Sequence, residues 1–117
     1  MSKIYNKLVR DKIPEIIAEK GEVARTRILS TAEFKEKLIE KMAEEVSEVE
    51  ESSLVFLKTP RSQVVRQNML KELADLQEVL LAVYETFNIS CEEVNRIRNK
   101  RKKERGAFKK HILLIES

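Results

Sequence analysis

Four carboxylates fall on or beside two helix faces that are otherwise apolar. Over residues 31–57, a projection at about 100° per residue places Glu45 inside the apolar face and Glu48 at its edge. Over residues 60–88, the same projection places Glu72 inside the apolar face and Asp75 at its margin. Residues three apart on a helix have Cβ atoms roughly 5–6 Å apart. The two carboxylates of each pair can therefore point toward the same position.

These carboxylates have two structural explanations besides chemistry. A solvated surface charge suits the other glutamates of residues 33–51 but not Glu45 or Glu72, since a lone carboxylate on an apolar face is costly unless it is protonated. A buried salt bridge is the second explanation, but neither face offers an obvious Lys or Arg partner. Converging carboxylates repel one another unless a cation lies between them, and oxygen-only ligation is what Mg²⁺ or Mn²⁺ prefers. The pattern favours a divalent metal site.

Two long helices are the elements expected to position these residues. Ser30 followed by Glu33 has the spacing of a capping box, which opens a helix that runs to about residue 57. Thr59 and Pro60 are expected as the N-cap and the first-turn proline of a second helix that ends near residue 88. No internal repeat or low-complexity linker divides the chain. We therefore expect one domain over residues 1–117.

The flanking segments predict smaller elements. Residues 11–20 are expected to form a short helix closed by Gly21, and Ser90 with Glu93 opens a basic helix over residues 90–104. Residues 22–29 and 108–115 are expected as two short strands that can pair. The predicted fold class is all-α, a helical bundle built on two long antiparallel helices with a small two-stranded β appendage.

Composition excludes several classes of protein. Of 117 residues, 37% are charged and 42% hydrophobic, which fits neither a disordered nor a membrane-spanning chain. No apolar run approaches the roughly 20 residues that span a bilayer, and residues 1–10 contain no signal-peptide core. The single Cys91 cannot form an internal disulfide. A cytoplasmic location and no membrane partner are therefore expected.

The charge is unevenly distributed along the chain. Residues 33–51 hold eight Glu against three Lys, whereas residues 96–110 hold nine Lys or Arg against one Glu. Such asymmetry is compatible with nucleic acid, with an anionic small molecule, or with two complementary protein surfaces. Composition does not choose among them.

The acidic pattern, together with both ends of the chain, resembles a known family. Glu44-Glu45-Val46-Ser47-Glu48 followed by Glu72-Leu73-Ala74-Asp75 resembles the EExxE…ExxD signature of the all-α nucleoside triphosphate pyrophosphohydrolases, the MazG-like superfamily. That superfamily includes dimeric dUTPases and phosphoribosyl-ATP pyrophosphohydrolase. Residues 5–14 (YNKLVRDKIP) and residues 105–108 (RGAF) resemble a narrower branch, called phosphoribosyl-ATP pyrophosphohydrolase-like or house-cleaning NTP pyrophosphatases. The likeness covers nearly the whole chain.

The resemblance implies an activity and a set of site residues. The family reaction is hydrolysis between the α- and β-phosphates of a nucleoside triphosphate, which releases a nucleoside monophosphate and pyrophosphate, here as house-cleaning of non-canonical nucleotides. The implied cofactor is Mg²⁺, or Mn²⁺ in its place. The implied metal ligands are Glu45, Glu48, Glu72 and Asp75, and the implied catalytic carboxylates are Glu44, Glu45 and Glu48. Of these, Glu44 lies on a different helix face in the projection.

The triphosphate also needs protein cations, and few lie on the faces of the four carboxylates. Two basic segments can supply them, the N-terminal one being next to a helix N-terminus that favours anions. The expected phosphate-binding residues are Lys7, Arg10, Lys12, Lys100, Lys103 and Arg105.

The second long helix indicates association with another chain. Beside its main apolar face it carries a second set of apolar residues, so that the apolar arc is wider than one partner helix needs. This set is Leu70, Ala74, Leu81 and Tyr84. A homodimer is the simplest expectation, and a homotetramer is the alternative.

Two other functions stay open at this stage. One is phosphoribosyl-ATP pyrophosphohydrolase itself, an enzyme of histidine biosynthesis. The other is a non-enzymatic nucleic-acid-binding helical module that uses the basic run of residues 96–105. That run lacks interleaved aromatic residues and a reading motif, which makes nucleic acid the weaker interpretation.

Overall fold

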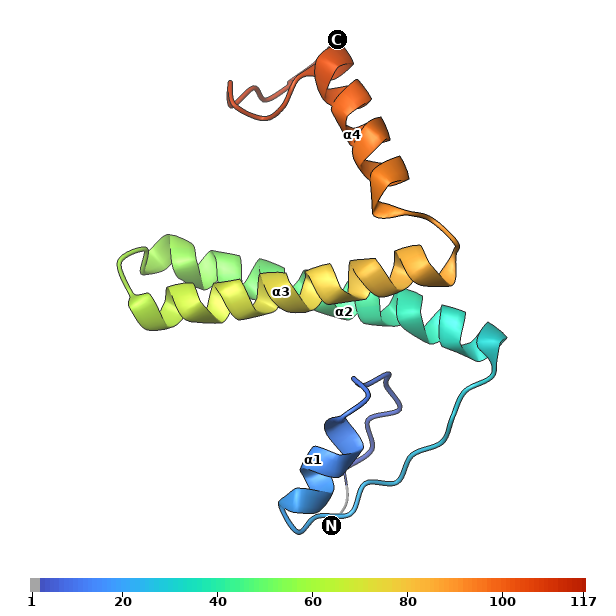
Figure 1. Cartoon of the computed structure of the whole chain (residues 1–117). Coiled ribbons are helices and arrows are strands. Elements are labelled where there is room, and N and C mark those ends of the chain that lie inside the picture. Colours follow the sequence, from blue (N-terminus) through green and yellow to red (C-terminus); the bar gives the residue numbers. More distant parts are fainter. Residues whose placement is uncertain (1–2) are drawn as a thin grey trace.

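The structure, a computed structural model, describes residues 3–117 and is all-helical. Its four helices are α1 (Ile13–Glu19), α2 (Thr31–Lys58), α3 (Gln63–Thr86) and α4 (Cys91–Arg105) (Figure 1). The prediction of an all-α chain is confirmed over these residues. None of the helices in this part of the chain combines the length and the apolar composition needed to cross a bilayer.

Local capping explains where α2 and α4 begin. The backbone N–H of Glu33 donates to the Ser30 hydroxyl at 3.2 Å, and the Glu33 carboxylate accepts from the Ser30 N–H at 3.2 Å. Ser90 and Glu93 make the same reciprocal pair at the start of α4. Each capping box satisfies backbone donors that the first turn of a helix leaves free. Both predicted helix starts are confirmed.

The predicted start of α3 is wrong by three residues. Thr59 ends α2 instead of capping α3, because its N–H and its hydroxyl both donate to the carbonyl of Val55. Ser62 is the N-cap of α3, and its hydroxyl accepts from the N–H of Val65 at 3.3 Å. Pro60 consequently lies in the turn between the two helices.

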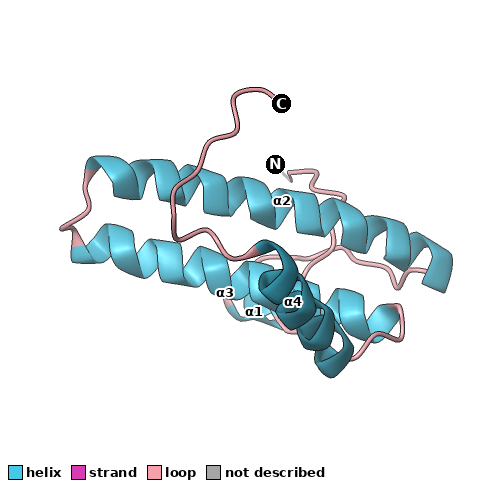
Figure 2. Cartoon of the chain, turned by 90° about the horizontal axis from the view of Figure 1, so that it is seen from above, coloured by secondary structure: helices cyan, strands magenta, loops and turns pink. Residues whose placement is uncertain are grey.

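α2 and α3 form the one extensive helix–helix interface in the described chain. The chain reverses in residues 59–62, and the two helices lie side by side in both views (Figures 1 and 2). Leu38, with 2% of its surface exposed, is the one large apolar side chain among residues 3–117 that is fully buried. Leu73 and Phe87 fall on the main apolar face of residues 60–88 in the helical projection, yet they are 41% and 42% exposed. One partner helix is too narrow to cover the whole apolar arc of α3.

The predicted β appendage is absent from the described residues. Residues 22–29 and 108–115 form no strand, and they lie on opposite sides of the α2–α3 pair (Figure 1). A strand needs a neighbour for its backbone hydrogen bonds, and an isolated two-stranded ribbon is marginal in water. Val23, Ile28 and Phe108 are accordingly 95–98% exposed.

The segments on either side of the long pair project from it as arms. The short helix α1 is closed by Gly21 at φ +80°, as the sequence predicts, with the Gly21 N–H donating to the Ala18 carbonyl. α4 extends from the far end of α3 on the side opposite α1 (Figure 1). The radius of gyration is 18.5 Å, against about 13 Å for a compact chain of this length. The single chain therefore has an open shape, in which α2 and α3 are packed together and the two arms project from them.

Candidate metal centre

Three carboxylates converge between the two long helices. Glu45 comes from α2, Glu72 and Asp75 come from α3, and one oxygen of each lies within 4.8 Å of the other two. Glu45 is 7% exposed, the Glu72 side chain is 12% exposed and the Asp75 side chain is 34% exposed. The group is therefore shielded from solvent at Glu45 and accessible to solvent at Asp75.

Glu48 is the predicted ligand that lies outside this group. It is exposed one turn further along α2, and it lines a depression of about 340 Å³ together with Glu72. At the same depression the side-chain amide of Asn68 donates to the hydroxyl of Ser52 at 3.1 Å, which joins α3 to α2. The structure therefore brings three of the four predicted ligands together and leaves Glu48 beside Glu72.

The environment of Glu72 makes its ionised form less favourable than that of an ordinary exposed glutamate. Burial raises the pKa of Glu72, and the negative charges of Glu48, Asp75 and Glu45 raise it further. Lys71, whose Nζ lies 3.9 Å from Glu72 Oε1, opposes these effects by lowering the pKa. Burial and nearby negative charges both disfavour the ionised form of a carboxyl group and therefore raise its pKa.

The sequence-based statement that the apolar faces offer no cationic partner is wrong. Lys41 Nζ lies 3.5 Å from Glu45 Oε1 and 3.4 Å from Glu44 Oε1, and the Lys41 side chain is only 16% exposed. Lys41 precedes Glu45 by four residues, a spacing that puts two side chains next to each other on a helix. The spacing of Lys41 and Glu45 could have predicted this ion pair from the sequence. A long lysine stem can lie along an apolar face while its ammonium group reaches a carboxylate.

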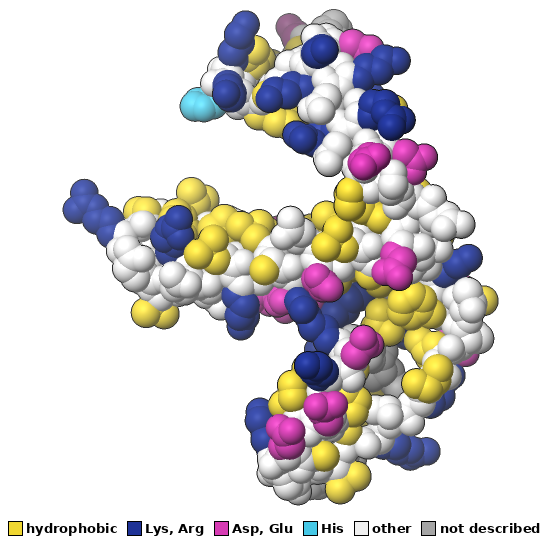
Figure 3. All heavy atoms as spheres, in the orientation of Figure 1, with side chains coloured by type: hydrophobic (Ala, Val, Ile, Leu, Met, Phe, Trp, Pro, Cys, Tyr) yellow, Lys and Arg dark blue, Asp and Glu magenta, His cyan; other side chains and the backbone are white. Residues whose placement is uncertain are grey.

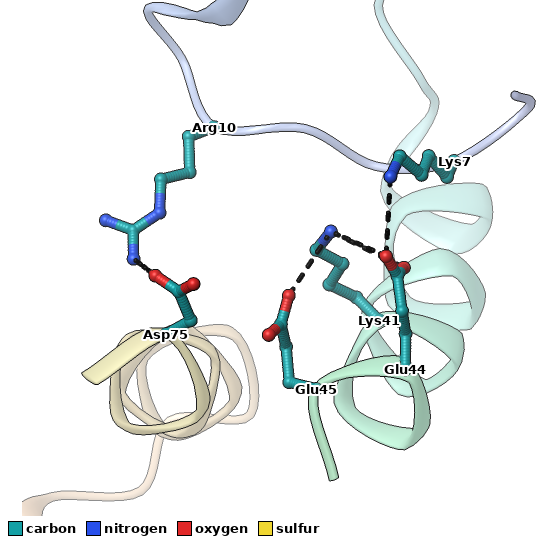
Figure 4. A network of polar contacts seen from close by, with 6 residues as sticks. All are labelled: Lys7, Arg10, Lys41, Glu44, Glu45 and Asp75. Carbon is teal, nitrogen blue, oxygen red and sulfur yellow. Dashed lines mark hydrogen bonds and ion pairs between the residues drawn. The ribbon is translucent and has the colours of Figure 1, made fainter. Parts of the chain in front are cut away.

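The N-terminal segment lies across the carboxylates and adds two more cations (Figure 4). Arg10 Nη2 donates to Asp75 Oδ1 at 2.7 Å, and Lys7 Nζ donates to Glu44 Oε1 at 3.4 Å. Lys37 holds the same segment to α2 by donating to the backbone carbonyl of Asn6 at 3.3 Å. Glu44 thus lies at the rim of the centre, between two lysines. Lys12 forms no ion pair within residues 3–117.

The C-terminal cations are not brought to the centre within one chain. Lys100, Lys103 and Arg105 lie on α4, which points away from α2 and α3 (Figure 1). All three are exposed, and none forms an ion pair in the described chain. Of the six predicted phosphate-binding residues, Lys7 and Arg10 are the two that contact the acidic residues.

The donor set suits a hard divalent cation. All three converging groups are carboxylates, and oxygen-only ligation is typical of Mg²⁺, Mn²⁺ and Ca²⁺ and not of zinc or copper. A doubly charged ion would relieve the repulsion that raises the pKa of Glu72.

Comparison of the chain with models of protein families, with curated proteins and with solved structures finds no match.

Proposed function

We propose that the protein is a Mg²⁺-dependent nucleoside triphosphate pyrophosphohydrolase, with Mn²⁺ able to replace Mg²⁺. The reaction cleaves the bond between the α- and β-phosphates and gives a nucleoside monophosphate and pyrophosphate. The observation that carries the proposal is the convergence of Glu45, Glu72 and Asp75 from two helices, within 4.8 Å of one another. Cations of the chain surround this group.

Each acidic residue has a role in this proposal. Glu45, Glu72 and Asp75 hold the ion, and Glu48 joins them by turning toward Glu72, with which it already shares a depression. Divalent ions in such sites neutralise phosphate charge and lower the pKa of a bound water. Glu44, whose side chain is 34% exposed at the rim, is the carboxylate best placed to accept a proton from water.

The neighbouring cations are proposed to exchange partners when substrate binds. Arg10 and Lys7 neutralise carboxylates in the structure described above. A divalent ion on those carboxylates would leave the guanidinium and the ammonium without partners, at the mouth of the centre. A guanidinium matches two phosphate oxygens geometrically, and an ammonium adds a point charge. The same side chains can therefore screen the empty acidic group and later hold the phosphates.

The substrate class is proposed from the resemblance and from the open mouth of the centre. Non-canonical nucleoside triphosphates are the expected substrates of the branch that the N-terminal motif resembles. Tyr5 is 60% exposed, so its ring is available to stack on a base once the ammonium groups of Lys3 and Lys7, which lie over it, turn to the phosphates. The proposal also includes the predicted bundle, in which α2 and α3 form the antiparallel pair and a second chain supplies further helices.

The direct test is release of pyrophosphate from a panel of canonical and modified nucleoside triphosphates, with Mg²⁺ and with EDTA. We expect Glu45→Gln and Glu72→Gln each to lower the rate more than about 100-fold, with helix content unchanged by circular dichroism. The matched control is Glu78→Gln, an exposed glutamate on α3 outside the group, which should keep wild-type activity. Activity that resists EDTA, or full activity in Glu72→Gln, would contradict the proposal.

The exposed, unpaired cations of α4 favour one second candidate, a nucleic-acid-binding module. Binding of duplex DNA and of RNA across a salt series distinguishes it from the enzyme. Affinity that falls steeply with salt, without pyrophosphate release from any nucleotide, would favour this candidate. Pyrophosphate release with only weak nucleic-acid binding would favour the enzyme.

A further inference from the structure

The surface of the single chain is far larger than that of a compact protein of its mass. The solvent-accessible area is 10894 Å², whereas a compact monomer of 13.7 kDa exposes about 6,600 Å². The difference, roughly 4,300 Å², is several times the area of about 800 Å² that one partner contributes to an interface of standard size. The single chain therefore exposes enough surface for an extensive interface with a partner.

Part of this excess is an apolar depression on α3, which we call the α3 groove. Its volume is about 400 Å³. Leu70 and Leu73 in its lining are 44% and 41% exposed, and Leu81 next to it is 43% exposed. In Figure 3, apolar side chains follow the edge of the α2–α3 pair that faces α4. The groove is lined by Leu70, Leu73, Ala74, Leu76, Gln77 and Leu80.

The C-terminal arm, residues 91–117, contains a segment of matching chemistry. The tail that follows α4 carries five large apolar side chains that are 76–98% exposed, namely Phe108, Ile112, Leu113, Leu114 and Ile115. The tail has no helical or strand structure that would bury them. These apolar side chains are therefore not covered by any other part of the described chain.

The C-terminal arm also differs in charge from the rest of the molecule. The arm carries nine Lys or Arg against four Glu, whereas residues 1–90 carry fourteen against sixteen Asp or Glu. None of the nine basic residues forms an ion pair in the part of the chain described. Glu36, Glu50 and Glu51 of α2 are exposed and equally without ion pairs there. A basic arm and an acidic body are complementary between copies of the same chain.

We propose that two copies of this chain exchange their C-terminal arms, so that the tail of each copy lies in the α3 groove of the other. Docking of the tail on its own chain would leave the far end of the helix pair bare, where Leu57 and Val64 are 75% and 80% exposed. The excess area of the single chain is larger than one tail can cover, which favours a second copy as the partner. The proposal rests on no carboxylate of the metal centre, so absence of enzymatic activity would not contradict it.

The first experiment measures the oligomeric state of the full chain by sedimentation at micromolar concentration. We expect a dimer or a larger even-numbered assembly. Leu113→Asp should weaken the association at least about 10-fold by placing a charge in an apolar interface, with unchanged helix content because residue 113 lies outside every helix. Ser117→Asp places the same charge in the same tail without removing an apolar side chain, and it should associate like wild type. A monomeric wild type, or a Leu113→Asp variant that associates normally, would overturn the proposal.

The second experiment tests which surfaces meet. In a Cys91→Ser background, chains with Gln77→Cys in the α3 groove are mixed with chains with Leu114→Cys in the tail and exposed to a mild oxidant. Arm exchange predicts a disulfide-linked pair that contains one chain of each kind. Arg61→Cys, in the turn between α2 and α3, replaces Gln77→Cys as the control and should not link. An assembly without the 77–114 link would show that another surface joins the copies, and the arm-exchange proposal would be wrong.

Discussion

Arg10 and the divalent cation of the proposed enzyme compete for the same carboxylate. Arg10 Nη2 lies 2.7 Å from Asp75 Oδ1. In Arg10→Ala we expect nucleotide affinity or turnover to fall at least about 10-fold, because a phosphate ligand is lost. The affinity for Mn²⁺ without nucleotide should stay the same or rise, because a competing positive charge is removed. Titration calorimetry with Mn²⁺ and steady-state kinetics measure the two effects separately.

The matched control for Arg10→Ala is Lys12→Ala, two residues further along the same segment. Lys12 forms no ion pair in the described chain, so its loss should change Mn²⁺ affinity least. A large drop in Mn²⁺ affinity in Arg10→Ala would mean that Arg10 orients Asp75 for the metal instead of competing with it. Wild-type kinetics in both variants would leave the segment with a structural role only.

The pKa of Glu72 predicts how the metal-free protein responds to pH. Burial and three neighbouring carboxylates raise this pKa above the ordinary value of 4.5. A carboxyl group whose pKa is raised in the folded state contributes stability below its unfolded pKa, and this contribution is lost as pH rises through the folded value. In EDTA, Glu72→Gln should therefore become more stable relative to wild type as pH rises through that window.

Urea unfolding of both proteins in EDTA at a series of pH values measures this difference. The same titration predicts that Mn²⁺ affinity of the wild type weakens on acidification while ordinary exposed glutamates are still ionised, because Glu72 must lose its proton to bind the ion. A stability difference that does not vary with pH would show that Glu72 has an ordinary environment.

At the scale of the helix, the capping box that starts α2 is the element whose removal is easiest to interpret. Ser30→Ala should lower the free energy of unfolding by about 1 kcal/mol, because backbone donors of the first turn lose their acceptor. Ser47→Ala, an exposed serine in the middle of α2 without a side-chain hydrogen bond, is the control. Urea unfolding measures both, and equal stability of the two variants would contradict the role of the cap.

The same capping box should persist far into the acidic range. The hydrogen bond from Arg27, followed by those from the backbone and side chain of Ser30, lowers the pKa of Glu33, and together they bring it to about 2. A lowered carboxyl pKa contributes stability above the unfolded value, and that contribution is lost as pH falls through about 2. The start of α2 is thus fixed by contacts within seven residues of sequence, Arg27 to Glu33.

At the scale of the whole molecule, the basic residues of α4 can serve the metal centre only in another chain. Lys100, Lys103 and Arg105 lie on α4, which projects away from α2 and α3 of its own chain (Figure 1). If they bind phosphate across the proposed assembly, an inactive Glu45→Gln chain and an impaired Lys103→Ala, Arg105→Ala chain should restore activity when mixed and allowed to exchange. One site in such a mixed dimer would contain all of its residues.

Activity assays of the two variants, alone and mixed, check this prediction. Lys109→Ala paired with Glu45→Gln is the control, since Lys109 lies beyond α4 and outside the predicted phosphate-binding set. Wild-type activity in the Lys103→Ala, Arg105→Ala chain by itself would remove α4 from the site.

Features that depend on neighbours along the chain can be predicted from the sequence. Ser30 with Glu33 and Ser90 with Glu93 located two helix starts, because a capping box is made within one turn. Glu45, Glu72 and Asp75 were identifiable because helical periodicity alone places a carboxylate on an apolar face. Lys41 could have been found in the same way, four residues before Glu45.

Features that depend on which distant segments meet are visible in the three-dimensional structure and not in the sequence. Arg10 and Asp75 are 65 residues apart in sequence, and no periodicity relates them. The segments 22–29 and 108–115 have strand-like composition but no partner within reach, so they stay unpaired. Leu73 has a core pattern yet is 41% exposed, because burial is set by the helices that pack against α3 and α2 covers only part of its apolar arc.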